Sequence, residues 1–302
     1  MDLINEIKAI TNEKNIKVNE PTSKHTSFKT GGPADVFVTP ETKDEIVKLL
    51  KLDVKKTIIG NGSNILVKDG GIRGLVIKIN TNNFKIEDDI IYADAGCSLA
   101  KLSRLAMENS LSGLEFACGI PGTLGGAIYM NAGAYGGEMK DVVIETVALD
   151  KEGKMHVIKD HEFGYRTSCF QDNDLIIISS KIQLQHGDMS AIKEKMDENM
   201  NARKQKQPIG KPNAGSTFKK PKDNFAAKLI QDAGLKGYSI GDAQVSDLHA
   251  GFIINKGNAT SKDILELMKY VREKVNTEYG VCLLYTSPSP RDQSLSRMPS
   301  SA

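Results

Sequence analysis

Two glycine-rich stretches contain the residues whose types and spacing most clearly indicate ligand binding. The first is GNGSN at 60–64, and the second is GIPGTLGGAIYMNAGAYGGE at 119–138, where seven of twenty residues are glycine. Glycine loses more backbone entropy on folding than any other residue, so such clusters need a reason. The reason is either a series of tight turns or a main chain that lies directly against a ligand, where a Cβ atom would collide.

Neither stretch matches a standard phosphate motif. The first lacks the Gly-Lys-Ser/Thr of a P-loop, and it has Ile65 where the dinucleotide fingerprint needs its third glycine. What remains at 60–64 is a turn rich in backbone N–H groups, a nest of the kind that binds a pyrophosphate. A diphosphate held between two backbone surfaces needs glycine on both sides, and residues 119–126 supply a second surface. On spacing alone, two unrelated turns stay open as the alternative.

Three other segments contain side chains that could take part in chemistry. Ser216 lies in NAGSTFKKP, Arg166 in YRTSCF and His249 in AQVSDLHAGFIIN. Each also has a plainer interpretation: Ser216 as a loop serine, Arg166 as a solvated charge, and His249 as a hydrogen-bonded core residue. Arg166 could otherwise direct its positive charge into a cleft.

The elements that would position these residues mix strands and helices without strict alternation, which predicts an α+β fold. A loop rich in Pro, Gly and Asn around Pro208 indicates a boundary before a smaller second domain. Strands are expected at 56–60, 64–67, 74–79, 90–96, 142–150, 154–158, 174–185 and 252–255; helices are expected after the caps Thr39, Ser98, Asp223 and Ser261, and at 190–207.

Composition narrows the class of protein further. The 302 residues have a net charge of +2 with both signs interspersed, which gives no support to a nucleic-acid partner. No apolar run is long enough to span a membrane, and the N-terminus lacks a signal-peptide pattern. Four separated cysteines fit a reduced, cytoplasmic protein, and the five histidines have no metal-ligand spacing, so no metal is expected.

Taken in order, five motifs resemble one enzyme family. GNGSNILV, GIPGTLGGAIYMNAGAYGGE, YRTSCF, NAGSTFKKP and KGYSIGDAQVSDLHAGFIIN are similar to the shorter (type II) UDP-N-acetylenolpyruvoylglucosamine reductases, or UDP-N-acetylmuramate dehydrogenases. The resemblance covers about residues 20 to 282. It implies an FAD-binding module of the vanillyl-alcohol-oxidase-like type at 1–207, made of two α+β subdomains, followed by a small α/β substrate domain at 208–284.

The resemblance also implies a noncovalent FAD, whose pyrophosphate the first glycine-rich stretch would hold. No Cys or His lies in either loop to form a covalent flavin link. The implied FAD-binding residues are Gly60, Asn61, Gly62, Ser63, Asn64, Gly119, Ile120, Pro121, Gly122, Thr123, Gly125, Gly126 and Ala127.

The implied reaction belongs to peptidoglycan precursor synthesis. NADPH reduces the flavin, whose N5 then passes a hydride to the enolpyruvyl double bond of the UDP-sugar, giving UDP-N-acetylmuramate. Arg166 matches the arginine that stabilises the developing enolate-like charge, and Ser216 matches the serine that protonates the adjacent carbon. The implied substrate contacts are Tyr165, Lys206, Gln244 and His249.

Two positions depart from the family pattern. Lys220 replaces an asparagine in the Phe-Lys-Asn-Pro motif, and Thr286 stands where the family has a catalytic glutamate. Half of residues 285–302 are Ser or Pro, which predicts a disordered, non-native tail. The alternatives are therefore a flavin-binding homologue with impaired catalysis, or another oxidoreductase of the same flavin fold.

Overall fold

The chain folds into two compact units in a computed structural model that describes residues 3–286. Unit 1 comprises the chain up to Val18 together with Val36–Asn61 and Gly74–Ala202. Unit 2 comprises Asn19–Asp35, Gly62–Arg73 and the chain from Arg203 onward. The domain limits expected at 207 and 284 stay a prediction, but two short N-terminal segments cluster with the C-terminal part of the chain.

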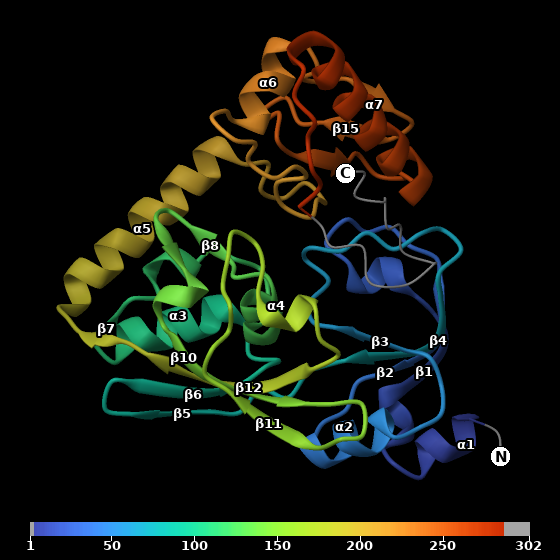
Figure 1. Cartoon of the computed structure of the whole chain (residues 1–302), viewed down its shortest axis with the longest axis vertical. Coiled ribbons are helices and arrows are strands. Elements are labelled where there is room, and N and C mark those ends of the chain that lie inside the picture. The colour runs from blue at the N-terminus through green and yellow to red at the C-terminus, as the bar shows by residue number, and fades with distance from the viewer. Residues whose placement is uncertain (1–2, 287–302) are drawn as a thin grey trace. The chain divides into compact units, whose positions relative to one another are not determined.

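A five-stranded antiparallel sheet forms much of unit 1, in the order β11-β10-β12-β6-β5 (Figure 1). The long strands β10 and β12 pair through Thr146 and Ser180, and β12 continues to β6 through Ser180 and Ala93. The strands expected at 90–96, 142–150, 154–158 and 174–185 are confirmed. Their bounds are β5 Phe84–Glu87, β6 Ile90–Asp94, β10 Val143–Leu149, β11 Met155–Ile158 and β12 Ile176–Gln183.

A second sheet has four strands in the order β1-β2-β4-β3, with β3 parallel to β4. The strand expected at 64–67 does not form; that segment is irregular. Its apolar residues are explained by burial instead, since Val67 is almost fully buried without belonging to a sheet. The bounds are β1 Ile16–Pro21, β2 Pro33–Val38, β3 Lys56–Ile59 and β4 Ile72–Lys78.

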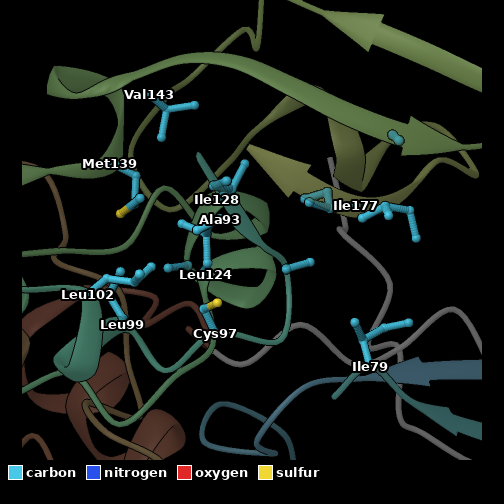
Figure 2. Close-up of a cluster of buried hydrophobic side chains, with 14 of the residues drawn as sticks. Ile79, Ala93, Cys97, Leu99, Leu102, Leu124, Ile128, Met139, Val143 and Ile177 are labelled. Atoms are coloured by element: carbon cyan, nitrogen blue, oxygen red, sulfur yellow. The ribbon is translucent and has the colours of Figure 1, made fainter. Parts of the chain in front are cut away.

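Helices α3 (Leu99–Glu108) and α4 (Leu124–Tyr129) bury their apolar faces in the core of unit 1 (Figure 2). Leu99 and Leu102 of α3 lie in the same buried cluster as Ile128 of α4. Ser98 caps α3 as expected, because its side chain accepts a hydrogen bond from the N–H of Lys101.

Helix α2 (Lys43–Leu50) begins later than expected. Its cap is Thr42, not Thr39, because Thr42 and Glu45 form a reciprocal capping box. A glutamate three residues after the cap therefore decides the start of this helix more strongly than the Pro40 that follows Thr39.

Unit 2 packs helices α6 (Ala226–Asp232) and α7 (Ser261–Tyr279) with a three-stranded antiparallel sheet, β14-β15-β16. The expected cap Asp223 is wrong, since Phe225 precedes α6 and supplies no side-chain hydrogen bond. Ser261 is likewise the first helical residue, and Thr260 is the cap, again through a capping box. The strands are β14 Ser239–Ile240, β15 Ala243–Val245 and β16 Ile253–Asn255.

The remaining elements are short, apart from one long charged helix, α5, expected at 190–207 and found one residue earlier at both ends. None of the helices in the described part of the chain is both long enough and apolar enough to span a membrane. The bounds are α1 Leu3–Lys8, α5 Met189–Lys206, β7 Leu111–Ser112, β8 Gly133–Ala134, β9 Gly137–Glu138, β13 Gln185–His186, η1 Glu13–Asn15, η2 Thr22–His25, η3 Glu115–Ala117, η4 Met139–Asp141 and η5 Cys169–Gln171.

Candidate active site

The start of the first glycine-rich loop, Gly60 and Asn61, meets the second loop within unit 1. A Cβ atom at Gly60 would lie 2.5 Å from Oγ1 of Thr123, and the side-chain amide of Asn61 donates to the carbonyl oxygen of Pro121 at 3.3 Å. The contact explains the glycine at 60 in physical terms, because any side chain there would push the second loop away. The two loops are therefore one structure rather than two unrelated turns.

The first loop presents an unused row of donors. Within the described residues, the backbone N–H groups of 60–64 have no hydrogen-bond acceptor. Gly62 has a φ of +61°, the left-handed conformation that turns successive N–H groups toward one side. A concave row of free N–H groups fits a diphosphate, so this segment fits the pyrophosphate of FAD. Ser63 and Asn64 are partly buried beside it.

The second loop leads directly into α4. Thr123 is the N-cap of that helix, and its hydroxyl accepts the N–H of Gly126 at 3.3 Å. The N–H of Gly125 bonds to the carbonyl of Ala95, and a Cβ at Gly125 would lie 2.9 Å from the Cβ of Ala95. This glycine is therefore required by packing inside the protein. Of the other predicted residues here, Pro121 and Gly126 are exposed, Gly119 and Ile120 are partly buried, and Gly122 and Ala127 are buried.

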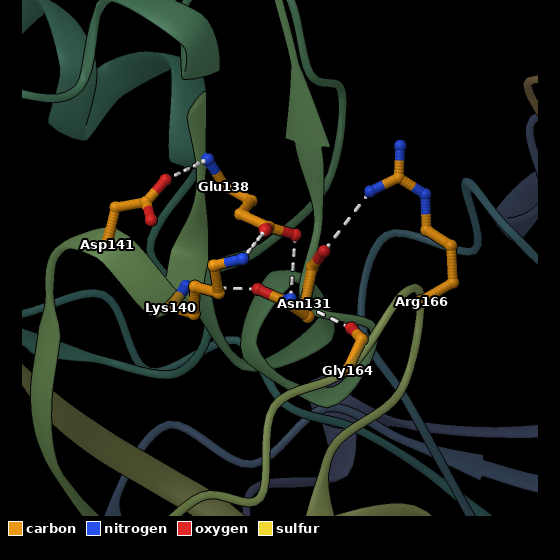
Figure 3. Close-up of polar contacts among 6 residues, drawn as sticks. All are labelled: Asn131, Glu138, Lys140, Asp141, Gly164 and Arg166. Carbon is orange, nitrogen blue, oxygen red and sulfur yellow. Dashed lines mark hydrogen bonds and ion pairs between the residues drawn. The ribbon is translucent and has the colours of Figure 1, made fainter. Parts of the chain in front are cut away.

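Arg166 lies on a tight turn closed by two hydrogen bonds between Gly164 and Thr167. Its φ is +59°, and its guanidinium donates to the carbonyl oxygen of Asn131 at 3.2 Å (Figure 3). The guanidinium also donates to the carbonyl oxygen of Gly133 at 2.7 Å. Among the described residues no carboxylate pairs with it, so its charge is oriented by neutral groups and stays available to an anion. The neighbouring Tyr165 is 54% exposed, and its ring lies 5.4 Å from the guanidinium carbon.

Ser216 lies in unit 2, is itself exposed and forms a backbone bridge to Phe252. The turn before it is shaped by Asn213, whose side-chain oxygen accepts the N–H of Gly215 at 2.9 Å. The segment after it is fixed on β16, since Thr217 donates its N–H to Gly251 and its hydroxyl accepts from Ile253. The backbone is thus held on both sides while the serine hydroxyl faces solvent.

The other predicted contacts of unit 2 differ in burial. His249 is half-buried, burial lowers the pKa of its imidazole, and its Nδ1 accepts the N–H of Gly251 at 3.1 Å. That bond requires Nδ1 to be unprotonated, so Nε2 bears the hydrogen of the neutral ring. Gln244 donates to the carbonyl of Gly237 at 3.0 Å, and Lys206 is exposed at the end of α5.

The first two residues of the expected tail, Tyr285 and Thr286, form backbone contacts with the rest of unit 2. Tyr285 bridges to Phe218, and the N–H of Thr286 donates to the carbonyl of Thr217 at 2.9 Å. Residue 286 therefore lies beside Thr217, the residue that follows Ser216. The hydroxyl of Thr286 is buried and has no partner within the described residues. The rest of the tail, 287–302, lies outside the described residues.

Two residues that sequence reasoning missed stand out in unit 1. Asn131 is fully buried and its carbonyl oxygen accepts a hydrogen bond from Arg166, although the clearest signal in its sequence motif is the glycines. His161 is also buried; its Nε2 lies 2.9 Å from the hydroxyl of Thr146, and burial lowers the pKa of its ring. A polar residue at the end of a glycine-rich helix was the one available signal for Asn131.

A hollow of about 380 Å³ on the five-stranded sheet contains none of the predicted site residues. Two of its lysines are already paired: Lys181 pairs across strands with Glu145 at 2.7 Å, and Lys43 of helix α2 pairs with Asp94 of β6 at 2.9 Å. Such cross-strand pairs stabilise a solvent-facing sheet surface. The described residues hold no group of three or more metal-ligating side chains.

Comparisons with known proteins identify the class and then the family. Residues 34–159 match the family model of an FAD binding domain, and residues 207–285 match that of the C-terminal domain of UDP-N-acetylenolpyruvoylglucosamine reductase. With the fold described above, these matches define the chain as an FAD-dependent oxidoreductase and confirm the expected fold class.

The similar curated proteins are named reductases, and the alignments cover nearly their whole length. The chain is 47% identical to UDP-N-acetylenolpyruvoylglucosamine reductase of Caldanaerobacter subterraneus over 93% of this chain and 96% of that protein, and 47% identical to that of Clostridium tetani over 93% and 94%. The crystal structure of the reductase from Thermus caldophilus superposes with a TM-score of 0.80 at 33% identity, covering 90% of this chain and 97% of that one. The chain belongs to the UDP-N-acetylenolpyruvoylglucosamine reductase family.

Proposed function

We propose that this chain reduces UDP-N-acetylglucosamine enolpyruvate to UDP-N-acetylmuramate with NADPH, in the cytoplasm, as a step of peptidoglycan precursor synthesis. The observation that carries the proposal is Arg166, a cation held by two neutral carbonyl oxygens and paired with no carboxylate among the described residues. Such a group can stabilise negative charge that develops on a carboxylate-bearing substrate, because it is already oriented and still charged.

FAD, when bound along 60–64 and 119–127, supplies the chemistry of hydride transfer between NADPH and the enolpyruvyl double bond. The chain's own contribution at that site is to bind and orient. The free N–H groups of the first loop would hold the two phosphates, and the second loop fixes the position of the first through Thr123.

Ser216 is proposed as the proton donor to the carbon next to the developing charge. A serine hydroxyl is a poor acid, so it can serve only where the acceptor is strongly basic and the hydroxyl is placed beside it. The support is its exposed position on a backbone fixed at Thr217 and Asn213. Tyr165, Lys206, Gln244 and His249 are proposed as substrate contacts.

Thr286 bears on how fast the chain can act. It occupies the position of the family glutamate, and a threonine cannot act as an anion or as a carboxylic acid. Its hydroxyl is buried without a partner in the described part of the chain, beside the backbone of Thr217. We therefore propose that the chain binds FAD and accepts electrons from NADPH, while it reduces the enolpyruvyl group slowly.

An anaerobic two-step experiment tests these proposals. The purified flavoprotein is reduced with NADPH, and the flavin absorbance is then followed after adding UDP-N-acetylglucosamine enolpyruvate. Slow reoxidation that forms UDP-N-acetylmuramate supports the proposal. Reduction without any reoxidation indicates a flavin-binding homologue that does not catalyse the reaction, and reoxidation by an alcohol-derived or lactone-derived acceptor instead indicates another oxidoreductase of this fold.

A further inference from the structure

We propose that Asn131 is the positioning residue of Arg166, an inference that rests on the role proposed for Arg166 above. Asn131 follows α4, is fully buried and has a φ of +40°. Each of its polar groups is used: the backbone N–H bonds to Ile128, the side-chain oxygen accepts from Lys140, and the side-chain nitrogen donates to Glu138 and Gly164.

Asn131 holds Arg166 at both ends. Its carbonyl oxygen accepts the guanidinium at 3.2 Å, while its side-chain nitrogen donates at 2.9 Å to the carbonyl of Gly164, which begins the turn that carries the arginine (Figure 3). The base and the tip of one side chain are therefore fixed by one buried residue. A long side chain fixed at both points loses most of its rotational freedom, which is the condition for oriented charge.

The chemistry of the amide matters for this arrangement. Its nitrogen faces two acceptors, the carboxylate of Glu138 at 2.8 Å and the carbonyl of Gly164, so two donated hydrogens are needed. An aspartate of the same shape would place an oxygen against both, and a buried carboxylate against a second carboxylate is strongly unfavourable. The left-handed backbone also favours asparagine or glycine at this position.

The arrangement keeps a carboxylate close without neutralising the arginine. Glu138 bonds to the side chain of Asn131 and pairs with Lys140, whereas among the described residues the guanidinium donates hydrogen bonds to two carbonyl oxygens and to no carboxylate. Asn131 thus stands between Glu138 and Arg166 in the network, with the carboxylate on its side-chain nitrogen and the guanidinium on its backbone oxygen. The arginine gains a fixed direction and keeps its charge for the substrate.

The test compares Asn131→Asp and Asn131→Gly with a matched control, Asn199→Asp. Asn199 is also buried in unit 1 and donates its side-chain amide to a carbonyl, that of Glu115 at 3.1 Å, but it does not contact the Arg166 turn. Glycine tolerates the positive φ, so Asn131→Gly removes the side chain without straining the backbone. This variant keeps the test usable if Asn131→Asp does not fold.

The first readout is independent of activity. Amide hydrogen exchange at Gly164 and Thr167, whose backbones bond to each other, should accelerate at least about tenfold in both Asn131 variants and stay unchanged in the control. The second readout is flavin reoxidation by the enolpyruvyl substrate, which should slow about 10- to 100-fold, while FAD content and reduction by NADPH stay unchanged.

A double-mutant cycle with Arg166→Lys separates this inference from the proposed function. If Asn131 acts through the arginine, Asn131→Gly should slow reoxidation little further in a chain that already carries Arg166→Lys. Additive effects, or Asn131 variants that behave like the control, would overturn the positioning role. If Arg166→Lys itself leaves reoxidation unchanged, the role proposed for Arg166 is wrong, and exchange at the turn still reports whether Asn131 holds it.

Discussion

Arg166 in unit 1 and Ser216 in unit 2 are proposed for the same reaction, yet their surroundings differ sharply. The arginine is partly buried on a turn closed by backbone hydrogen bonds, and two carbonyls fix its guanidinium. The serine is exposed, and only the backbone on either side of it is held. The guanidinium of Arg166 is hydrogen-bonded, whereas Thr286, whose N–H bonds to Thr217, has a buried hydroxyl that is unpaired within the described residues.

The difference follows from what each role requires. A cation that stabilises developing charge works best when its orientation is set before the reaction, so its supporting hydrogen bonds belong in the protein. A proton donor must reach the reacting carbon and be supplied with a new proton, so its hydroxyl must stay accessible. Arg166 is held by two carbonyl oxygens, whereas position 286, next to Thr217, carries a threonine, which has no ionisable group.

The largest expected effect on the reaction rate comes from placing a carboxylate at position 286, next to Thr217. Thr286→Glu should speed flavin reoxidation by the enolpyruvyl substrate by about 10²-fold or more, the range for a positioned acid or base. Stopped-flow absorbance after anaerobic reduction with NADPH measures it. Thr286→Gln, which has the same length without the charge, is the control, and an equal gain in both variants would contradict a role for the carboxylate.

Among changes around Arg166 in unit 1, Arg166→Lys should slow the reaction most. Lysine keeps the charge but cannot donate to two carbonyls in a fixed fork, so the orientation is lost. Reoxidation in the Thr286→Glu background should fall by about 10²-fold, as for loss of one oriented donor to an oxyanion. An unchanged rate would mean that charge alone suffices and that the contrast with Ser216 has no functional meaning.

Ser216→Ala should also slow reoxidation by about 10²-fold in the Thr286→Glu background. Because the hydroxyl is exposed, the substitution should leave the Tm, the FAD content and reduction by NADPH nearly unchanged. The two half-reactions are measured separately by flavin absorbance. A parental rate of reoxidation would show that another group delivers the proton.

Small changes in the loops of unit 1 should be poorly tolerated. Gly60→Ala would place a Cβ atom 2.5 Å from the Thr123 hydroxyl that caps α4, which should cost about 1 kcal/mol of stability, the usual cost of a lost N-cap. FAD retained after gel filtration should fall below that of the parental chain. Gly70→Ala is the control, since nothing lies within 4 Å of its added carbon and both variants add the same methyl group.

The smallest effect concerns the buried histidine before the Arg166 turn. Burial lowers the pKa of His161 below its ordinary value of 6.5, so the unfolded chain binds a proton there more readily than the folded chain does. Its contribution to stability is therefore fully present above about pH 6.5 and is lost as pH falls from there toward the lowered pKa. His161→Gln should reduce the fall in Tm between pH 7 and pH 5; an equally steep fall would assign the pH dependence to other groups such as His249.

The sequence by itself determined the elements whose signals are local. The α+β class, the strands around 90–96 and 142–150 and the Ser98 cap all follow from short-range periodicity and turn chemistry. The glycine content of 60–64 and 119–126 indicated a backbone-lined site before any contact was known. The family resemblance supplied the roles of Arg166 and Ser216, which the residues alone left open.

Only the tertiary structure decided which groups meet. The segment 64–67 forms no strand, although its apolar pattern predicts one and Val67 is buried. No local pattern shows that Gly60 faces Thr123, that Asn131 holds both ends of Arg166, or that residue 286 lies beside Thr217. These contacts join residues from 33 to 69 positions apart, since loop closure and burial, rather than propensity, bring them together.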